Sequence, residues 1–299
     1  MIHRVTQQTV HRSTLANVQM NLSKMSSLQA EMSSGKRVSR ASDDPIAAGR
    51  AMAYRSEKAA AEQAVTNASD GAAWLSQIDS TLQSSVSALR RARDLTVQAA
   101  NTGVLNDTSR EAIAVEIEGL RDTLLGLANT QLNGRSLFAG TSSTATAFED
   151  GAAATPYSWN GVSGSAVTRR ISPDTTVRVD ADGAAAFGDG AASVFQLLDD
   201  LAAEIRAGDP VGVRLDDLDS RLDAMVSTLT TVGVRYDQIT KAQSAAEAKV
   251  TTLRASISDV EDIDLAATVL ELQMQEVSYQ GALSAASRVL QPTLLDYLR

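Results

Sequence analysis

The chain has 299 residues, a formal net charge of -9 at pH 7, 43% apolar residues and only 4% aromatic residues. This acidic balance argues against nucleic acid or an anionic membrane surface as the main partner. The apolar residues are chiefly Ala, Leu, Val and Met, which favours thin helix-on-helix packing over a thick globular core. Cysteine is absent, which excludes a disulfide framework, a thiolate zinc site and a thiol nucleophile.

Neither end of the chain carries a membrane or secretion signal of the usual kind. The first twenty residues lack the uninterrupted apolar core of a cleavable signal peptide. Polar residues such as Thr268, Glu271 and Glu276 interrupt the last apolar segment well before the roughly 18 residues that a membrane span needs. If the protein leaves the cell, we expect export to depend on another signal.

The N-terminal segment predicts a helix, a polar connector and a second helix. The first helix is expected from about Thr6 to Ser34 and to end at Gly35. Its apolar residues keep coiled-coil spacing apart from Gln29. These residues are Leu15, Val18, Leu22, Met25 and Met32. The connector GKRVSRASDDP has no apolar period, and Asp44 followed by Pro45 is typical of a helix N-cap and first residue.

The second helix is expected to run from Pro45 to about Asn101, and a third is expected to end near Gln131. From Gly140 to about Ala192 the composition changes to Gly, Ala, Ser, Thr and Asp without a helical period. There AVTRRI and TTVRV read as short strands, and the pairs Asn160-Gly161 and Asp182-Gly183 read as turns. A small β-rich insertion is therefore predicted, followed by a short helix that stops at Gly208.

The most regular pattern of the chain is a heptad from Leu215 to Ile257, in which Gln243 is the one polar position. It predicts a long helix that packs along its whole length. After Ile257 this register fails and a new apolar phase starts at Ile263. The acidic stretch SDVEDID is therefore interpreted as a joint between two packing environments.

The last segment, from about Ile263 to Leu298, predicts a helix that is apolar on two nearly opposite faces. One face carries Ile263, Ala267, Leu270, Met274 and Val277. The other carries Leu265, Val269, Leu272, Tyr279, Leu283, Ala286 and Leu290. A helix that is apolar on both sides must be enclosed. We expect one face to receive the N-terminal helix and the other to receive neighbouring molecules.

Residues that would carry catalysis or bind a metal are sparse. The two histidines, His3 and His11, lie eight residues apart in a polar terminal segment, which is weak as a metal site. Asp180 and Asp182 lack the other ligands of a calcium loop and are better explained by a turn. We therefore predict no catalytic residue, no cofactor and no metal.

Several segments resemble the bacterial flagellin superfamily. The matching segments are LQAEMSSGKRVSRASDDPIAAGRAM, DGAAWLSQIDSTLQSSVSALRRARDLTVQAAN, NGRSLFAGT, SDVEDIDLA and ALSAASRVLQPTLLDYLR. They cover roughly the first 140 residues and the last hundred. Within the superfamily, NGRSLFAGT (133–141) resembles a junction subunit between hook and filament more than flagellin itself.

The resemblance implies a mainly α fold, an elongated rod of long coiled-coil helices from both chain ends with a small β-rich inserted domain. The implied domains are a terminal coiled-coil domain that lines an inner tube (1–42 and 258–299), a helical rod domain (43–140 and 193–257) and the β-rich outer insertion (141–192). It also implies an extracellular location at the hook-filament junction, reached by type III export without a cleavable signal.

The implied partners are further copies of the chain, the adjacent hook-associated protein, flagellin and an export chaperone. The expected assembly interface comprises Leu15, Val18, Leu22, Met25, Ile263, Leu265, Leu270, Leu272, Met274, Val277, Tyr279, Leu283 and Leu290. The expected joint between the terminal and rod domains comprises Gly35, Lys36, Arg37, Asp43, Asp44 and Pro45.

Three alternatives compete with a junction subunit. The first is a flagellin-type filament subunit. The second is a signalling coiled coil like the cytoplasmic part of a chemoreceptor, against which the β-rich insertion and the missing membrane span argue. An enzyme hidden in the insertion is the third, and no paired metal-ligand motif supports it.

Overall fold

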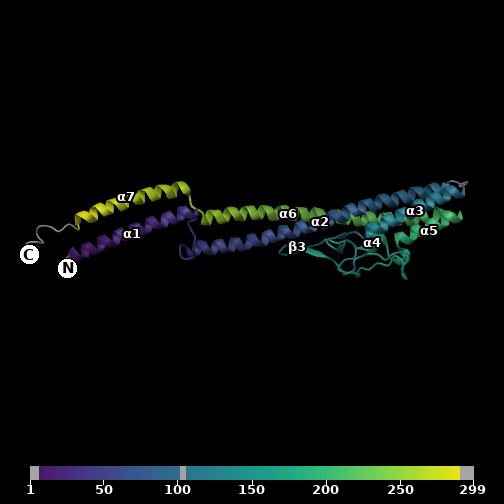
Figure 1. Cartoon of the computed structure of the whole chain (residues 1–299), viewed down its shortest axis with the longest axis horizontal. Coiled ribbons are helices and arrows are strands. Elements are labelled where there is room, and N and C mark those ends of the chain that lie inside the picture. Colours follow the sequence, from purple (N-terminus) through teal and green to yellow (C-terminus); the bar gives the residue numbers. More distant parts are fainter. Residues whose placement is uncertain (1–6, 102–105, 290–299) are drawn as a thin grey trace, which may run out of the picture. The chain divides into compact units, whose positions relative to one another are not determined.

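The structure is a computed structural model that describes residues 7–101 and 106–289, and it is mainly helical (Figure 1). Its α-helices are α1 (Gln7–Ser34), α2 (Pro45–Asn101), α3 (Asp107–Ala128), α4 (Gly183–Phe187), α5 (Val194–Ala207), α6 (Arg214–Glu261) and α7 (Leu265–Val289). Two short 3-10 helices, η1 (Gly190–Ala192) and η2 (Val211–Val213), flank α5. The mainly α class is confirmed, and the predicted bounds of α1, α2 and α5 hold to within a residue or two.

The strands form two small antiparallel sheets. Strands β1 (Gln131–Leu132) and β2 (Arg135–Ser136) pair across Asn133 and Gly134, whose φ angles of 52° and 75° suit a two-residue hairpin turn. Strands β3 (Thr168–Ser172) and β4 (Thr175–Arg178) pair with a register shift between Arg170 and Ser172. The two strands predicted inside the insertion are thus present, and most of the remaining described insertion is irregular chain.

The chain divides into two compact units. The first contains the N-terminal part through Ala59 and the C-terminal part from Val250, and the second contains Ala60–Lys249. The two long helices α2 and α6 each contribute residues to both units. The large hydrophobic core lies wholly within the second unit, between Ala68 and Ile239.

The helical seam of the second unit follows the predicted heptad of α6. Every seventh residue is fully buried, and these residues are Leu218, Met225, Val232 and Ile239. Tyr236 was predicted in the same seam, but it is 42% exposed. Close to it α2 and α6 approach tightly, since a Cβ built on Gly71 would lie 2.9 Å from Cδ1 of Ile239. Its exposure shows that the tyrosine ring lies outside the buried seam.

An aromatic cluster holds the insertion against α3 and α5. Phe138, Phe148, Phe187 and Phe195 are almost fully buried, and their ring centroids lie 5.1 to 5.9 Å apart in the pairs that touch. Trp159 packs against this core and donates from Nε1 to the Phe138 carbonyl at 2.8 Å. These side chains supply the apolar area that so short a sheet cannot supply.

Two aspartates predicted in a turn have other roles. Asp182 is the N-cap of α4, because its side chain accepts from the amides of Ala184 and Ala185. Asp180 is 1% exposed and pairs with Arg178, with the Nε to Oδ1 distance 2.8 Å. The turn prediction was wrong because the residues on either side do not reveal that Asp180 is buried against Arg178 or that a short helix begins at Gly183.

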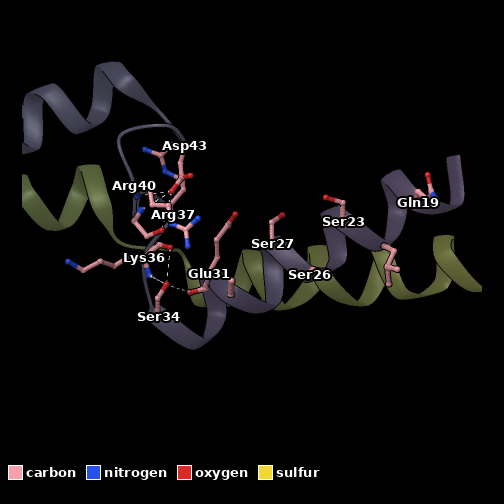
Figure 2. Close-up of a pocket in the computed structure, with 13 residues that line it drawn as sticks. Gln19, Ser23, Ser26, Ser27, Glu31, Ser34, Lys36, Arg37, Arg40 and Asp43 are labelled. Atoms are coloured by element: carbon pink, nitrogen blue, oxygen red, sulfur yellow. Dashed lines mark hydrogen bonds between the residues drawn. The ribbon is translucent and has the colours of Figure 1, made fainter. Parts of the chain in front are cut away.

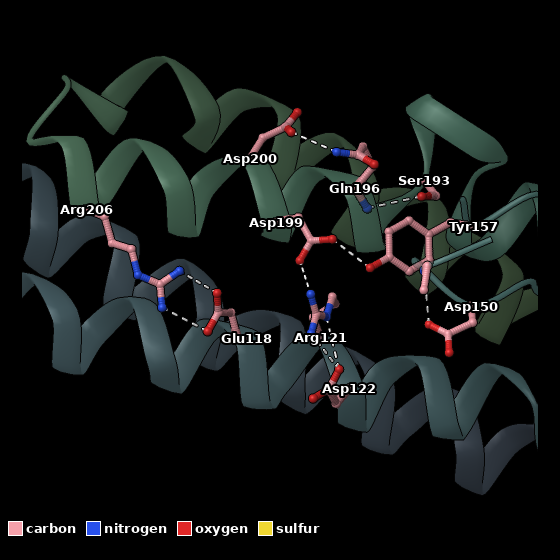
Figure 3. A network of polar contacts seen from close by, with 11 residues as sticks. Glu118, Arg121, Asp122, Asp150, Tyr157, Ser193, Gln196, Asp199, Asp200 and Arg206 are labelled. Carbon is pink, nitrogen blue, oxygen red and sulfur yellow. Dashed lines mark hydrogen bonds and ion pairs between the residues drawn. The ribbon is translucent and has the colours of Figure 1, made fainter. Parts of the chain in front are cut away.

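A polar network ties the insertion to α3 and α5 (Figure 3). The Tyr157 hydroxyl donates to Oδ2 of Asp199 at 2.6 Å, and Arg121 of α3 donates to the other carboxylate oxygen. Farther along, Arg206 of α5 pairs with Glu111 and Glu118 of α3. These side-chain hydrogen bonds lower the pKa of both glutamates. Such bidentate arginine pairs fix the register of α5 on α3.

Within the described residues, none of the helices is both long enough and apolar enough to cross a bilayer.

Candidate functional site

The two ends of the chain form an antiparallel helix pair, α1 with α7, inside the first unit (Figure 1). Along α1 the side chains that face α7 recur at spacings of four and three, as in a coiled coil. They are Thr14, Val18, Asn21, Met25, Leu28 and Met32. Leu28 is the most enclosed of them at 4% exposure.

This seam differs from the predicted one at alternate positions. Val18, Met25 and Met32 are half-buried as expected, whereas Leu15 and Leu22 are 60% and 46% exposed. Gln29 was predicted to interrupt the apolar seam of α1. The seam is continuous there because Leu28 occupies the seam position in its place. Two overlapping heptads share Val18 and Met25, so the sequence of α1 alone does not select between them.

On α7 the face toward α1 mixes apolar and polar side chains. Leu272 and Tyr279 are half-buried, and Thr268 and Ala286 are 8% exposed. Gln275 donates from Nε2 to the Asn21 carbonyl oxygen at 3.1 Å and to its side-chain oxygen at 3.3 Å. A polar pair at a seam position favours one register over its neighbours.

The opposite face of α7 is exposed and apolar. Leu270, Met274 and Val277 are 61%, 59% and 70% exposed and follow one another by four and three residues. Leu265 and Leu283 are also exposed, but they lie beside the residues of α7 that face α1, and Ile263, seven residues before Leu270, is half-buried. We call Leu270, Met274 and Val277 the outer strip. The last predicted interface residue, Leu290, lies outside the described residues.

The connector between α1 and α2 is held by local hydrogen bonds. Gly35 takes a φ of 69°, which an L side chain rarely adopts. Oδ2 of Asp43 accepts from the amides of Arg40 and Ser39. These hydrogen bonds, that from Arg40 most of all, lower the pKa of Asp43 below its ordinary value, although desolvation acts in the opposite direction. Asp44 caps α2 by accepting from the amides of Ile46 and Ala47 at 3.0 Å each, and Pro45 is the first residue of α2, as predicted.

Glu261, the last residue of α6, joins the connector to the C-terminal part of the first unit. Its backbone oxygen accepts from the amides of Arg37 at 2.7 Å and Val38 at 3.3 Å. Its Oε2 accepts from Nζ of Lys36 at 3.1 Å and Nη2 of Arg55 at 2.7 Å. Sequence reasoning did not single out this residue, because its partners are far away in the chain and its acidic neighbours in SDVEDID look alike.

A groove of about 910 Å³ runs beside α1 as far as the connector (Figure 2). One wall consists of small and polar residues of α1, and the other carries the charged connector residues. The lining residues are Gln19, Leu22, Ser23, Ser26, Ser27, Ala30, Glu31, Ser34, Lys36, Arg37, Ser39, Arg40 and Asp43. The groove thus joins the exposed Leu22 to the predicted joint.

The arrangement offers surfaces for packing rather than reactive groups. Among residues 7–101 and 106–289, no three His, Cys, Asp or Glu side chains gather where they could hold a metal. His11 is exposed on α1, and His3 lies outside the described residues. The site presents the helix pair of α1 and α7, which has one apolar face exposed. The hydrogen-bonded connector adjoins this pair.

Comparison with known proteins defines the class. Residues 5–143 match the family described as the bacterial flagellin N-terminal helical region. This match spans just under half of the chain, and it agrees with the resemblance to the bacterial flagellin superfamily seen in the motifs.

Within that superfamily the relatives include hook-associated proteins. The chain is 29% identical to flagellar hook-associated protein 3 of Escherichia coli over 302 residues, which covers 91% of this chain and 95% of the relative. It is 33% identical to the protein of the same name from Salmonella typhimurium over 147 residues, which covers 49% of this chain and 46% of that relative. It is also 28% identical to Bacillus subtilis flagellin, over 96% of this chain and 94% of the relative.

Solved structures share the fold. The crystal structure of Bacillus cereus FlgL has a TM-score of 0.59 at 24% identity, covering 69% of this chain and 99% of that one. A Vibrio parahaemolyticus protein assigned as flagellar hook-associated has a TM-score of 0.67 at 23% identity, covering 74% of this chain and 100% of that one.

Proposed function

We propose that this chain is a structural subunit of the bacterial flagellum that connects the hook to the filament. The observation that carries the proposal is the alignment with E. coli hook-associated protein 3 over nearly the whole length of both chains. In this role the chain is extracellular, performs no catalysis and is exported without a cleavable signal. Its partners are further copies of itself, the adjacent hook-associated protein, flagellin and, before export, a chaperone.

The exposed terminal residues are proposed as the assembly interface. The outer strip of α7 is supported by its exposure, since a run of apolar side chains at helical spacing is costly to leave in water. Leu15 and Leu22 offer a second exposed apolar surface on α1. The half-buried positions Val18, Met25, Leu272 and Tyr279 hold α1 and α7 together and act on assembly through that pairing.

The domain arrangement is part of the same proposal. The terminal coiled-coil domain (1–42 and 258–299) lines an inner tube, the rod domain (43–140 and 193–257) surrounds it, and the insertion (141–192) faces outward. The residues from Gly35 to Pro45 are the joint between the first two. The antiparallel pairing of α1 with α7 and the helix break after Glu261 support this division.

A genetic experiment tests the role. Deleting the gene in the parent bacterium is expected to leave hooks without filaments and to release flagellin into the medium. Expressing Leu270→Asp in that strain should restore secretion of the subunit but not filaments, because a carboxylate on the outer strip cannot be buried against a neighbour. Electron microscopy and immunoblots of the medium provide the measurements.

Ser287→Asp is the matched control, since it places the same carboxylate at an exposed polar position of α7 that is not three, four or seven residues from any residue of the outer strip. This variant is expected to restore filaments. Normal filaments in the deletion strain would refute the junction role, and normal filaments with Leu270→Asp would refute the outer strip as a contact.

The similarity to Bacillus subtilis flagellin over 96% of the chain supports one alternative, a filament subunit. Purified protein that polymerises into long filaments would favour that alternative. The segment NGRSLFAGT supports the junction role instead; it contains the turn and the second strand of the β1–β2 hairpin and Phe138 of the aromatic cluster.

A further inference from the structure

The connector after α1 and the break between α6 and α7 are hydrogen-bonded to one another. Besides the two amides that donate to the Glu261 carbonyl, the Ile263 amide donates to the Gly35 carbonyl at 3.1 Å, and Lys36 lies opposite Asp262 in a one-residue antiparallel bridge. We call the connector (35–44) and the break (262–264) the paired hinge. Neither backbone can bend there without breaking hydrogen bonds to the other.

The Glu261 side chain adds a charged bond to this paired hinge. It is 4% exposed, while its partners Lys36 and Arg55 are 43% and 54% exposed. One carboxylate oxygen therefore receives two cations, one from the connector and one from α2. A buried carboxylate needs such partners, and removing its charge leaves the two cations without a shared anionic acceptor.

We propose that Glu261 is a positioning residue that locks the paired hinge. Its ion triad with Lys36 and Arg55 holds the connector against the end of α6. The triad thereby fixes the direction of the α1–α7 pair relative to the adjoining turns of α2 and α6. The importance of this direction for assembly rests on the proposed function, because the outer strip must meet its neighbours at a set angle. The lock itself is a property of the isolated chain.

Hydrogen exchange of the purified full-length chain tests the lock. In Glu261→Gln we expect exchange at the Arg37, Val38 and Ile263 amides to rise roughly tenfold or more, the effect of losing a charge-assisted hydrogen bond. Exchange in the buried helices of the second unit should not change. Exchange that rises everywhere would mean general destabilisation, and exchange that stays as in the wild type would show that Glu261 locks nothing. Either result overturns the proposal.

Two controls isolate the charge. Asp259→Asn removes a carboxylate from the same last turns of α6, where Asp259 is exposed, and should leave the three amides unchanged. Arg55→Gln combined with Glu261→Gln should accelerate exchange no more than Glu261→Gln alone, since both changes break the same contact. In the wild type, molar salt should accelerate exchange at these amides because both cations are reached by solvent. Full additivity of the two substitutions would contradict the triad.

The functional arm separates the two proposals. In the deletion strain, Glu261→Gln should be secreted yet form fewer filaments, whereas Asp259→Asn should behave as the wild type. If the three amides exchange faster in Glu261→Gln but filaments form normally, the direction that Glu261 sets does not matter for assembly. That result would leave the junction role unaffected. If the deletion strain itself has normal filaments, the junction role falls, and the exchange data still decide whether Glu261 is a lock.

Discussion

Single residues set the geometry of the second unit at places that local propensity does not favour. Tyr157 adopts a φ of 57°, which is uncommon for a residue with a side chain. The conformation is stabilised at both ends of the residue, because its carbonyl accepts from the Gly190 amide at 3.0 Å and its hydroxyl donates to Asp199. The strained backbone is thus offset by one backbone and one charge-assisted hydrogen bond.

We predict that Tyr157→Phe lowers the free energy of unfolding by about 1.5–3 kcal/mol, the typical contribution of a hydrogen bond to a charged group. Urea denaturation followed by circular dichroism measures it. Tyr236→Phe is the control, since that ring is 42% exposed, and should change stability by less than about 0.5 kcal/mol. Equal effects of the two substitutions would show that the Asp199 contact contributes nothing.

The same hydroxyl predicts a dependence on alkaline pH. Burial, together with the hydrogen bond to Asp199, raises the pKa of Tyr157 above its ordinary value of about 10. The folded state therefore retains this proton while the unfolded chain releases it. The contribution to stability is complete below about pH 10 and is lost as the pH rises further. Tyr157→Phe should weaken the alkaline loss of stability, and an unchanged pH profile would contradict the assignment.

The ion pairs of Glu261 could not be predicted from the sequence. Lys36 and Glu261 are separated by 225 positions, so no local pattern joins them. Asp43, Asp44 and Pro45 were predictable because capping chemistry acts within four residues. Hydrogen bonds between residues close in the chain can be predicted from the sequence, whereas ion pairs between distant parts of the chain cannot.

Among the elements, α5 shows how a helix end can be fixed by glycine. Gly208 follows α5 with a φ of 80°, and its amide donates back into the last turn. The next amide, of Asp209, donates to the Glu204 carbonyl at 3.0 Å, which completes a Schellman-type end. A Cβ on Gly208 would also lie 2.5 Å from Nη1 of Arg110 on α3.

Gly208→Ala is therefore expected to destabilise the protein by about 1–2 kcal/mol, from the left-handed backbone conformation and from the displacement of Arg110. Gly212→Ala is the matched control, because Gly212 has no heavy atom within 4 Å of an added Cβ. Thermal melts of the two variants provide the comparison. A Gly208→Ala variant as stable as the control would mean that α5 ends equally well without the left-handed turn.

Element by element, the helices were predictable and one seam was not. The end of α1, the start of α2 and both ends of α5 follow from caps, glycines and prolines that act locally. The α1 seam was assigned wrongly at Leu15 and Leu22, since those residues and Val18 with Met25 fit two overlapping heptads. Only the facing helix selects one, and the Asn21–Gln275 contact that marks the choice involves residues 254 positions apart.

At the scale of the whole molecule, the two units differ in how much apolar surface they bury. The second unit holds the entire large core, including four phenylalanines. In the first unit the buried apolar side chains are fewer and mostly small. Among the described residues of that unit they are Leu28, Val38, Ala47, Ala51, Val250, Leu253 and Ala286. Burial scales with stability, so the first unit is expected to open more readily.

Limited proteolysis of the dilute full-length chain tests this difference. We expect early cleavage within α1 and α7 and a persistent fragment close to residues 60–249, identified by mass spectrometry. The outer strip provides an additional check, since any assembly that covers it should slow cleavage within α7. Protease-resistant termini in dilute monomer would contradict the expected order of stability.

The pairing of the two chain ends has a consequence for the order of synthesis. Every contact between α1 and α7, and each bond of Glu261 to the connector, joins the earliest part of the chain to the latest. A ribosome-bound chain can complete the second unit once α6 has emerged, but the first unit must wait for the final helix. Premature termination between residue 249 and the start of α7 would therefore give a folded middle with unclosed ends, and the product would also lack the outer strip.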